Sequence, residues 1–153
     1  MKRLQNIILG LSAILAIIII IDFSFTGQTI EELTIDTKAK LERYYNAGGN
    51  SHTSHRVITE NYNFLVTEAF QDAVEDNTAL QLAISPIFNE VNSAKITKTQ
   101  QKETYSLRIY SGLIFPLLLL IALVLFFKFP DRLTIITFIL VILNIANFTY
   151  LCF

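Results

Sequence analysis

The sequence has little cysteine and little charge. Its single cysteine, Cys152, excludes an intramolecular disulfide. Charged residues make up 16% of the chain, against 52% for hydrophobic residues, and soluble domains usually carry roughly 25% charge. The net charge of −1 provides no overall positive field of the kind that attracts nucleic acid. We therefore expect neither a disulfide framework nor a nucleic-acid partner.

Long hydrophobic runs occupy both ends of the chain. Three runs contain no charged residue, and they cover residues 4–21, 109–127 and 133–153. Even the shortest would be about 27 Å long as a helix, close to the roughly 30 Å thickness of a bilayer core. A cleaved signal peptide is the alternative for the first run. That run is longer than a usual signal-peptide core, and residues 23–26 offer no small-residue cleavage site. We predict three transmembrane helices, with the lipid bilayer as partner.

The last two runs are separated by only five residues, 128–132. So short a connection predicts an antiparallel hairpin of two spans. Pro130 suits the turn because proline cannot continue a helix. Pro116 lies inside the second span, where its missing N–H predicts a kink.

The charges next to the spans predict their orientation. Lys2 and Arg3 precede the first span, and Lys128 and Arg132 lie between the last two. Positive charge prefers the cytoplasmic side, so we predict a cytoplasmic N-terminus, with the middle domain and C-terminus extracytoplasmic. The isoleucine-rich spans and the lack of glycosylation sequons in the middle domain are typical of a multi-pass protein of a bacterial inner membrane.

The segment between the first two spans shows short alternating runs broken by turn signals. The alternation predicts strands near residues 33–41, 55–59, 62–67, 79–84 and 87–91, with a helical segment at 68–74. Turns are expected at residues 48–50, 60–61 and 75–77. The core candidates are Val57, Tyr62, Phe64 and Val66. The alternation also assigns apolar residues to one half-buried face of the first strand (Leu33, Ile35 and Leu41) and to one face of the strand at 79–84 (Leu80, Leu82 and Ile84).

The predicted fold class is a membrane protein of α+β type. Three transmembrane helices carry a small β-rich extramembrane domain, a curved sheet or partly open barrel, between the first and second helix. The predicted parts are an anchor at 1–22, the β-rich domain at 23–91, a polar basic helical stalk at 92–108 and a transmembrane hairpin at 109–153.

Two groups of polar residues are candidates for interaction. Asn144 and Asn147 lie three residues apart in the third span and Tyr150 continues the row, so on a helix they share a face. Buried amides need partners, either within the chain's own bundle, on another protein, or along a transport path. Residues Lys95, Lys98 and Lys102 would share one face of a helical stalk, which is either solvated or in contact with lipid phosphates or an acidic partner.

No pattern in the sequence indicates an active site. His52 and His55 are the only histidines, and on a strand their spacing places them on opposite faces. No HExxH or CxxC motif is present. We predict no catalytic residue, metal, cofactor or small-molecule ligand, and interpret both histidines as exposed residues that are candidates for interaction with a partner.

The leading hypothesis is a non-enzymatic inner-membrane protein. Its extracytoplasmic domain would bind a membrane or extracytoplasmic protein, for example within a membrane assembly. One alternative is an immunity or inhibitor protein against a toxin that acts on the cell envelope. A second is an envelope enzyme that uses His52, His55 and Glu60. A transporter is a further alternative, weakened by the lack of charge within the predicted spans.

Overall fold

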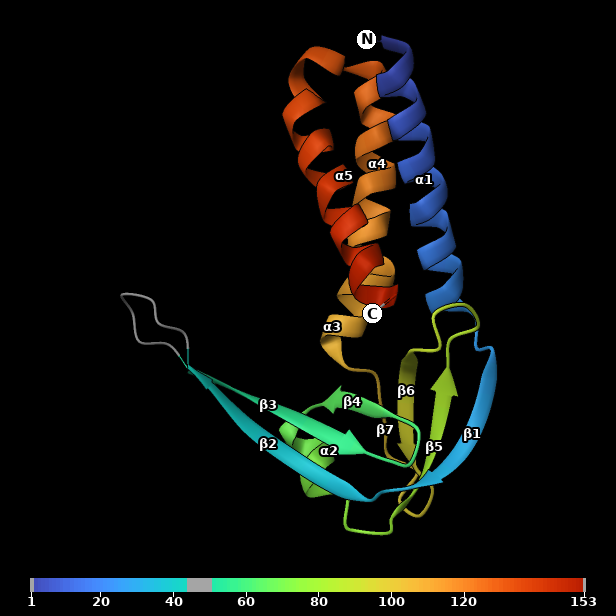
Figure 1. The fold of residues 1–153 in the computed structure, drawn as a ribbon, viewed down its shortest axis with the longest axis vertical. Coiled ribbons are helices and arrows are strands. Elements are labelled where there is room, and N and C mark those ends of the chain that lie inside the picture. Colours follow the sequence, from blue (N-terminus) through green and yellow to red (C-terminus); the bar gives the residue numbers. More distant parts are fainter. Residues whose placement is uncertain (1, 44–50, 153) are drawn as a thin grey trace. The chain divides into compact units, whose positions relative to one another are not determined.

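The computed structural model describes residues 2–43 and 51–152, and it has an α+β fold. Three helices are long and apolar enough to span a membrane, and two small sheets lie between the first and second of them in sequence. The chain divides into two compact units (Figure 1). The helical unit comprises Met1–Thr26, Ser85–Glu90 and Ser106–Phe153, and the β-rich unit comprises Gly27–Ile84 and Val91–Tyr105.

The helical unit contains the three predicted long helices. The first is α1, Lys2–Ser24, and the last is α5, Pro130–Cys152. The second is continuous but consists of α3 (Ser106–Ile109), the π-helix η1 (Tyr110–Ile114) and α4 (Phe115–Lys128). The three helices pack around a buried apolar cluster of Leu9, Ala16, Leu119, Leu123 and Val141.

Both prolines of the predicted hairpin affect the helices, but Pro130 does so in a different way from the prediction. The backbone widens into η1 immediately before Pro116, and the Phe115 N–H bonds to the Tyr110 oxygen. A π-turn is a known cause of a helix irregularity, as is proline. Pro130 does not lie between helices but is the first residue of α5. The prediction that it only ends a helix was wrong, because proline is favoured in the first turn, where no N–H is needed.

The β-rich unit consists of two antiparallel sheets. One has the order β1-β5-β6-β7 and the other the order β2-β3-β4. A short helix, α2 (Glu68–Asp72), follows β4. The strands are β1 (Gln28–Leu33), β2 (Asp36–Arg43), β3 (Ser51–Ile58), β4 (Asn63–Val66), β5 (Ala79–Ile84), β6 (Val91–Ile96) and β7 (Lys102–Glu103).

Two of the four predicted core candidates, Val57 and Val66, are buried in this unit. Phe70 of α2 is fully buried, and the side chains of β5 that alternate inward are buried with it. Tyr62 and Phe64 are half-buried against this cluster. The β3–β4 hairpin, the helical segment after it and the strand at 79–84 are also confirmed. The cluster consists of Val57, Val66, Phe70, Val74, Leu80, Leu82, Ile84, Ala94 and Ile96.

The predicted strand over 33–41 is divided between two sheets. The chain changes sheet at Thr34, which is buried and whose N–H bonds to the Thr78 oxygen. As a result Leu33, Ile35 and Leu41 are exposed, although the alternation assigned them to a half-buried face. Alternation identifies a face of a strand but not what covers that face.

The helical stalk predicted over 92–108 is wrong, because residues 92–105 belong to the β-rich unit and include β6 and β7. Ala94 and Ile96 alternate inward along β6 and enter the core, which outweighs the helical spacing of the lysines. Glu103 of β7 accepts hydrogen bonds from the N–H and hydroxyl of Thr67, the residue that caps α2. The β-rich unit therefore reaches Tyr105, well beyond the predicted boundary at residue 91.

Two further expectations concern turns and loops. The last strand was expected at 87–91, but residues 85–90 form a loop between β5 and β6, and β6 begins at Val91. The strand prediction failed because this loop bonds to a helix, as described below. The turn expected at 48–50 lies outside the described residues.

Candidate functional site

A buried ion pair joins the first two long helices. Asp22 lies in the last turn of α1 with no exposed surface, and Arg108 of α3 is only 7% exposed. Arg108 Nη2 lies 2.9 Å from Asp22 Oδ2. The guanidinium carbon of Arg108 also lies 5.6 Å from the centre of the Phe23 ring. Asp and Arg are almost never fully buried unless paired, so the burial of each residue depends on the other.

The same carboxylate holds the loop Ser85–Glu90. Asp22 Oδ1 accepts the backbone N–H groups of Ile87 at 2.7 Å and Phe88 at 3.1 Å. The ring of Phe88 packs edge-on against Phe148 of α5. The loop that joins β5 to β6 is therefore built into the helical unit through one carboxylate and one aromatic contact.

Glycine at position 112 allows η1 to lie directly against α1. A Cβ atom at Gly112 would lie 2.5 Å from the ring of Phe23 and 2.7 Å from its Cβ. Real Cβ atoms do not approach that closely, and the ring is held by its own helix. Close approach of small residues is the usual means of tight helix contact in apolar surroundings.

Glu90 closes the loop next to this ion pair. Burial raises the pKa of the Glu90 carboxyl above its ordinary 4.5, and the nearby Asp22 carboxylate adds to the rise, while Arg108 opposes it. The Glu90 N–H bonds to Ser85 Oγ, and its oxygen accepts the Ser85 N–H, so the loop ends are held together.

Glu90 should make the folded protein less stable as pH rises. Its folded pKa lies above the unfolded value, so the folded state binds more protons between pH 4.5 and that raised pKa. The contribution of Glu90 to the free energy of unfolding is therefore complete below pH 4.5 and decreases as the pH rises through that interval. Glu90→Gln should remove this part of the pH dependence of the melting temperature. The exposed Glu75→Gln is the control, and an equal change in both variants would contradict the assignment.

Two of the three polar residues predicted on the last helix bond within the chain. Asn147 Nδ2 donates to the Ser111 oxygen of η1 at 2.7 Å, and Asn144 Nδ2 lies 3.5 Å from the Ser12 oxygen of α1. Tyr150 is 56% exposed and does not join them. These contacts support the alternative in which the amides serve the chain's own bundle.

The three candidate lysines do not share a helix face. Lys95 and Lys102 are directly opposite each other on β6 and β7, and Lys98 lies in the turn between these strands. Like charges directly opposite on a sheet are unfavourable. The group is therefore a basic turn of the β-rich unit and not a stalk.

The histidines and Glu60 are not brought together. His52 and His55 lie three residues apart on β3, hence on opposite faces, and His55 Nδ1 is hydrogen-bonded to Gln71 Oε1. Glu60 lies beyond the far end of β3, about 20 Å along the strand from His52, beside a hollow of about 460 Å³ that Glu31 and Glu32 also line. Within residues 2–43 and 51–152, no three His, Cys, Asp or Glu residues could hold one metal ion.

The outer half of the β2–β3 hairpin stands apart from the core of its unit. β4 pairs with β3 only from His55 onward, so residues 51–54 of β3 have β2 as their paired strand and no described strand on the other side. Figure 1 shows this two-stranded ribbon projecting from the rest of the β-rich unit. We call residues 38–43 and 51–54 the arm. Within it Ala39, Lys40, Leu41, Ser51 and His52 are exposed.

Neither the arm nor the ion pair was predicted from the sequence. The strand expected near 55–59 begins at Ser51, so the outer part of the hairpin was missed, and so was Asp22–Arg108. Its signal was present, because an acid directly follows the first apolar run and a base directly precedes the second. Comparison with protein-family models, with curated proteins and with solved structures finds no match to this chain, so its function is inferred from the geometry alone.

Proposed function

We propose that this chain is a multi-pass protein of a bacterial inner membrane that presents its β-rich unit outside the cytoplasm to bind another protein. Support for insertion comes from the outward faces of the helices. Val124, Phe127 and Ile135 are each more than 70% exposed, and soluble proteins rarely leave extended apolar surface exposed. A bilayer would cover these faces, with every backbone group inside the helices already satisfied.

The proposed orientation follows from the charges next to the long helices and from the order of the segments along the chain. Lys128 and Arg132 flank the turn between α4 and α5, and Arg3 lies in the first turn of α1. Positive residues near span ends prefer the cytoplasm. The β-rich unit follows the opposite end of α1 in sequence, so it lies outside the cytoplasm in this arrangement.

The arm is the observation that supports the binding function. A two-stranded hairpin on its own is marginally stable in water, yet this chain extends one past its core, and β2 is an edge strand that pairs only with β3 among the described residues. Ala39, Leu41 and Thr53 share one face of the arm, and Lys40 and His52 belong to the other. An extended segment of a partner protein could pair with the edge of β2 and cover Leu41, as in strand addition.

The test compares two exposed leucines of the same unit. Leu41 of the arm and Leu33 of β1 are 53% and 56% exposed, so each can take a charge without losing core contacts. Tagged Leu41→Glu should lose the proteins that co-purify with the native chain in mild detergent, by at least about ten-fold if the contact is central. Leu33→Glu should retain them. If both variants retain the same partners, or the native chain purifies alone, the arm is not the binding surface.

A further inference from the structure

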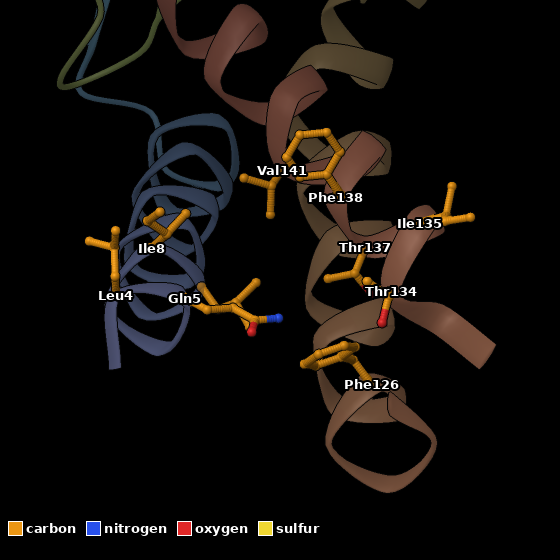
Figure 2. A pocket seen from close by; sticks show the side chains of 10 residues that line it. Leu4, Gln5, Ile8, Phe126, Thr134, Ile135, Thr137, Phe138 and Val141 are labelled. Atoms are coloured by element: carbon orange, nitrogen blue, oxygen red, sulfur yellow. The ribbon is translucent and has the colours of Figure 1, made fainter. Parts of the chain in front are cut away.

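A groove opens between α1 and α5 at the end of the helical unit that holds the α4–α5 turn. Its volume is about 480 Å³, within the roughly 300–1,000 Å³ of small-molecule sites. Leu9 and Val141 form a buried floor, while Leu4, Ile8 and Ile135 form an exposed rim. The groove is therefore open to the outside of the bundle along its length (Figure 2).

Polar groups interrupt this apolar lining at two depths. Figure 2 shows the Gln5 amide reaching from α1 into the space beside α5. Deeper in the groove, Thr137 is only 2% exposed, and its Oγ1 has no hydrogen-bond partner among the described residues. The nearby Thr134 hydroxyl, by contrast, bonds to the Pro130 oxygen. A buried hydroxyl without a partner is costly, so the groove is suited to an occupant that supplies a hydrogen-bond acceptor at this depth.

Three basic residues lie close in sequence to residues that line the groove. Arg3, Lys128 and Arg132 are exposed; Arg3 directly precedes the lining residue Leu4, and the other two each lie two residues from a lining residue. Asp131 is the single acidic residue in 1–21 and 109–153. Thr137 lies about 7.5 Å along α5 from Arg132. From the end of the groove inward, the chain therefore offers cationic residues first, then hydrogen-bonding side chains, and then apolar side chains.

We propose that this groove binds one anionic phospholipid of the surrounding bilayer. Its phosphate lies at Arg3 and Arg132, an ester oxygen accepts the Thr137 hydroxyl, and an acyl chain lies between Ile8 and Val141. Basic sites between transmembrane helices on the cytoplasmic side are known to bind anionic head groups. This inference rests on the membrane placement proposed above but not on the arm.

Native mass spectrometry of the full chain in detergent tests the site. The chain is offered equal amounts of phosphatidylglycerol and phosphatidylethanolamine. One phosphatidylglycerol should be retained per chain, preferred by about ten-fold because its head group carries a net negative charge beside two cations, whereas the ammonium group of phosphatidylethanolamine neutralises its phosphate. Ile8→Trp, which fills the groove, should abolish retention, whereas Ile7→Trp, at a neighbouring exposed position that does not line the groove, should not. Arg3→Gln/Arg132→Gln should remove the preference, and the control Lys98→Gln/Lys102→Gln should keep it.

Three results would overturn the proposal. These are equal retention of the two lipids by the native chain, equal loss in the Ile7→Trp and Ile8→Trp variants, or a lipid-free dimer that Ile8→Trp dissociates, which would assign the groove to a second copy. Fractionation of the chain with membranes and the arm's partners are separate measurements. Failure of lipid binding is therefore distinguishable from failure of the proposed function.

Discussion

Asp22→Asn should destabilise the helical unit by about 3–5 kcal/mol, the usual cost of removing one partner from a buried ion pair. The amide retains an oxygen for the N–H groups of Ile87 and Phe88, so the loss comes mainly from the charge of Arg108, which stays buried beside a neutral side chain. For a chain of this size the melting temperature should fall by roughly 6–20 °C. Thermal unfolding in detergent, followed by circular dichroism, measures it.

An exposed pair in the same chain is the matched control. Asp36 and Lys38 lie 3.4 Å apart but are about half exposed, and exposed pairs contribute roughly 0–1 kcal/mol. Asp36→Asn should therefore change little. Asp22→Asn/Arg108→Gln should recover part of the lost stability, because no charge then remains buried. Equal melting temperatures for Asp22→Asn and Asp36→Asn would contradict the described role of the buried pair.

Phe70→Ala should unfold the β-rich unit while leaving the long helices formed. Phe70 is fully buried at the centre of the cluster that both sheets share. Truncating a buried phenylalanine costs about 3–5 kcal/mol, a large part of the stability of so small a core. Amide hydrogen exchange should accelerate by about 10²–10³-fold along β5 and remain slow in α4.

Phe25→Ala is the control for this substitution, because Phe25 is 63% exposed at the end of α1. It should leave exchange in β5 at the native rate. If Phe70→Ala accelerated α4 as much as β5, the two units would unfold together, contrary to the division described here.

The long helices and the local strands could be predicted because their signals are local. Charge-free runs identify spans by length alone, and the alternation of Leu80, Leu82 and Ile84 corresponds directly to a buried strand. The exposure of Leu33 and the sheet membership of Lys95 could not be predicted in this way. They depend on which strand pairs with which, and a period of two residues carries no information about distant partners.

The candidate sites were difficult to predict for the same reason. The arm was not predicted, because the strand expected near 55–59 begins at Ser51 and pairs there with β2, while the turn expected at 48–50 lies outside the described residues. The Asp22–Arg108 pair joins residues 86 positions apart. The groove needs three helices placed around it, so only the three-dimensional arrangement reveals Thr137 as a buried hydroxyl facing apolar neighbours.

Labelling of single cysteines in spheroplasts tests the proposed membrane arrangement most directly. With Cys152→Ser as background, Lys98→Cys lies in the β6–β7 turn and Lys128→Cys at the end of α4. A membrane-impermeant maleimide should label Lys98→Cys on intact spheroplasts, and Lys128→Cys only after the membrane is opened. Labelling of Lys128→Cys alone, or of both before opening, would contradict a three-span protein that presents its β-rich unit outside the cytoplasm.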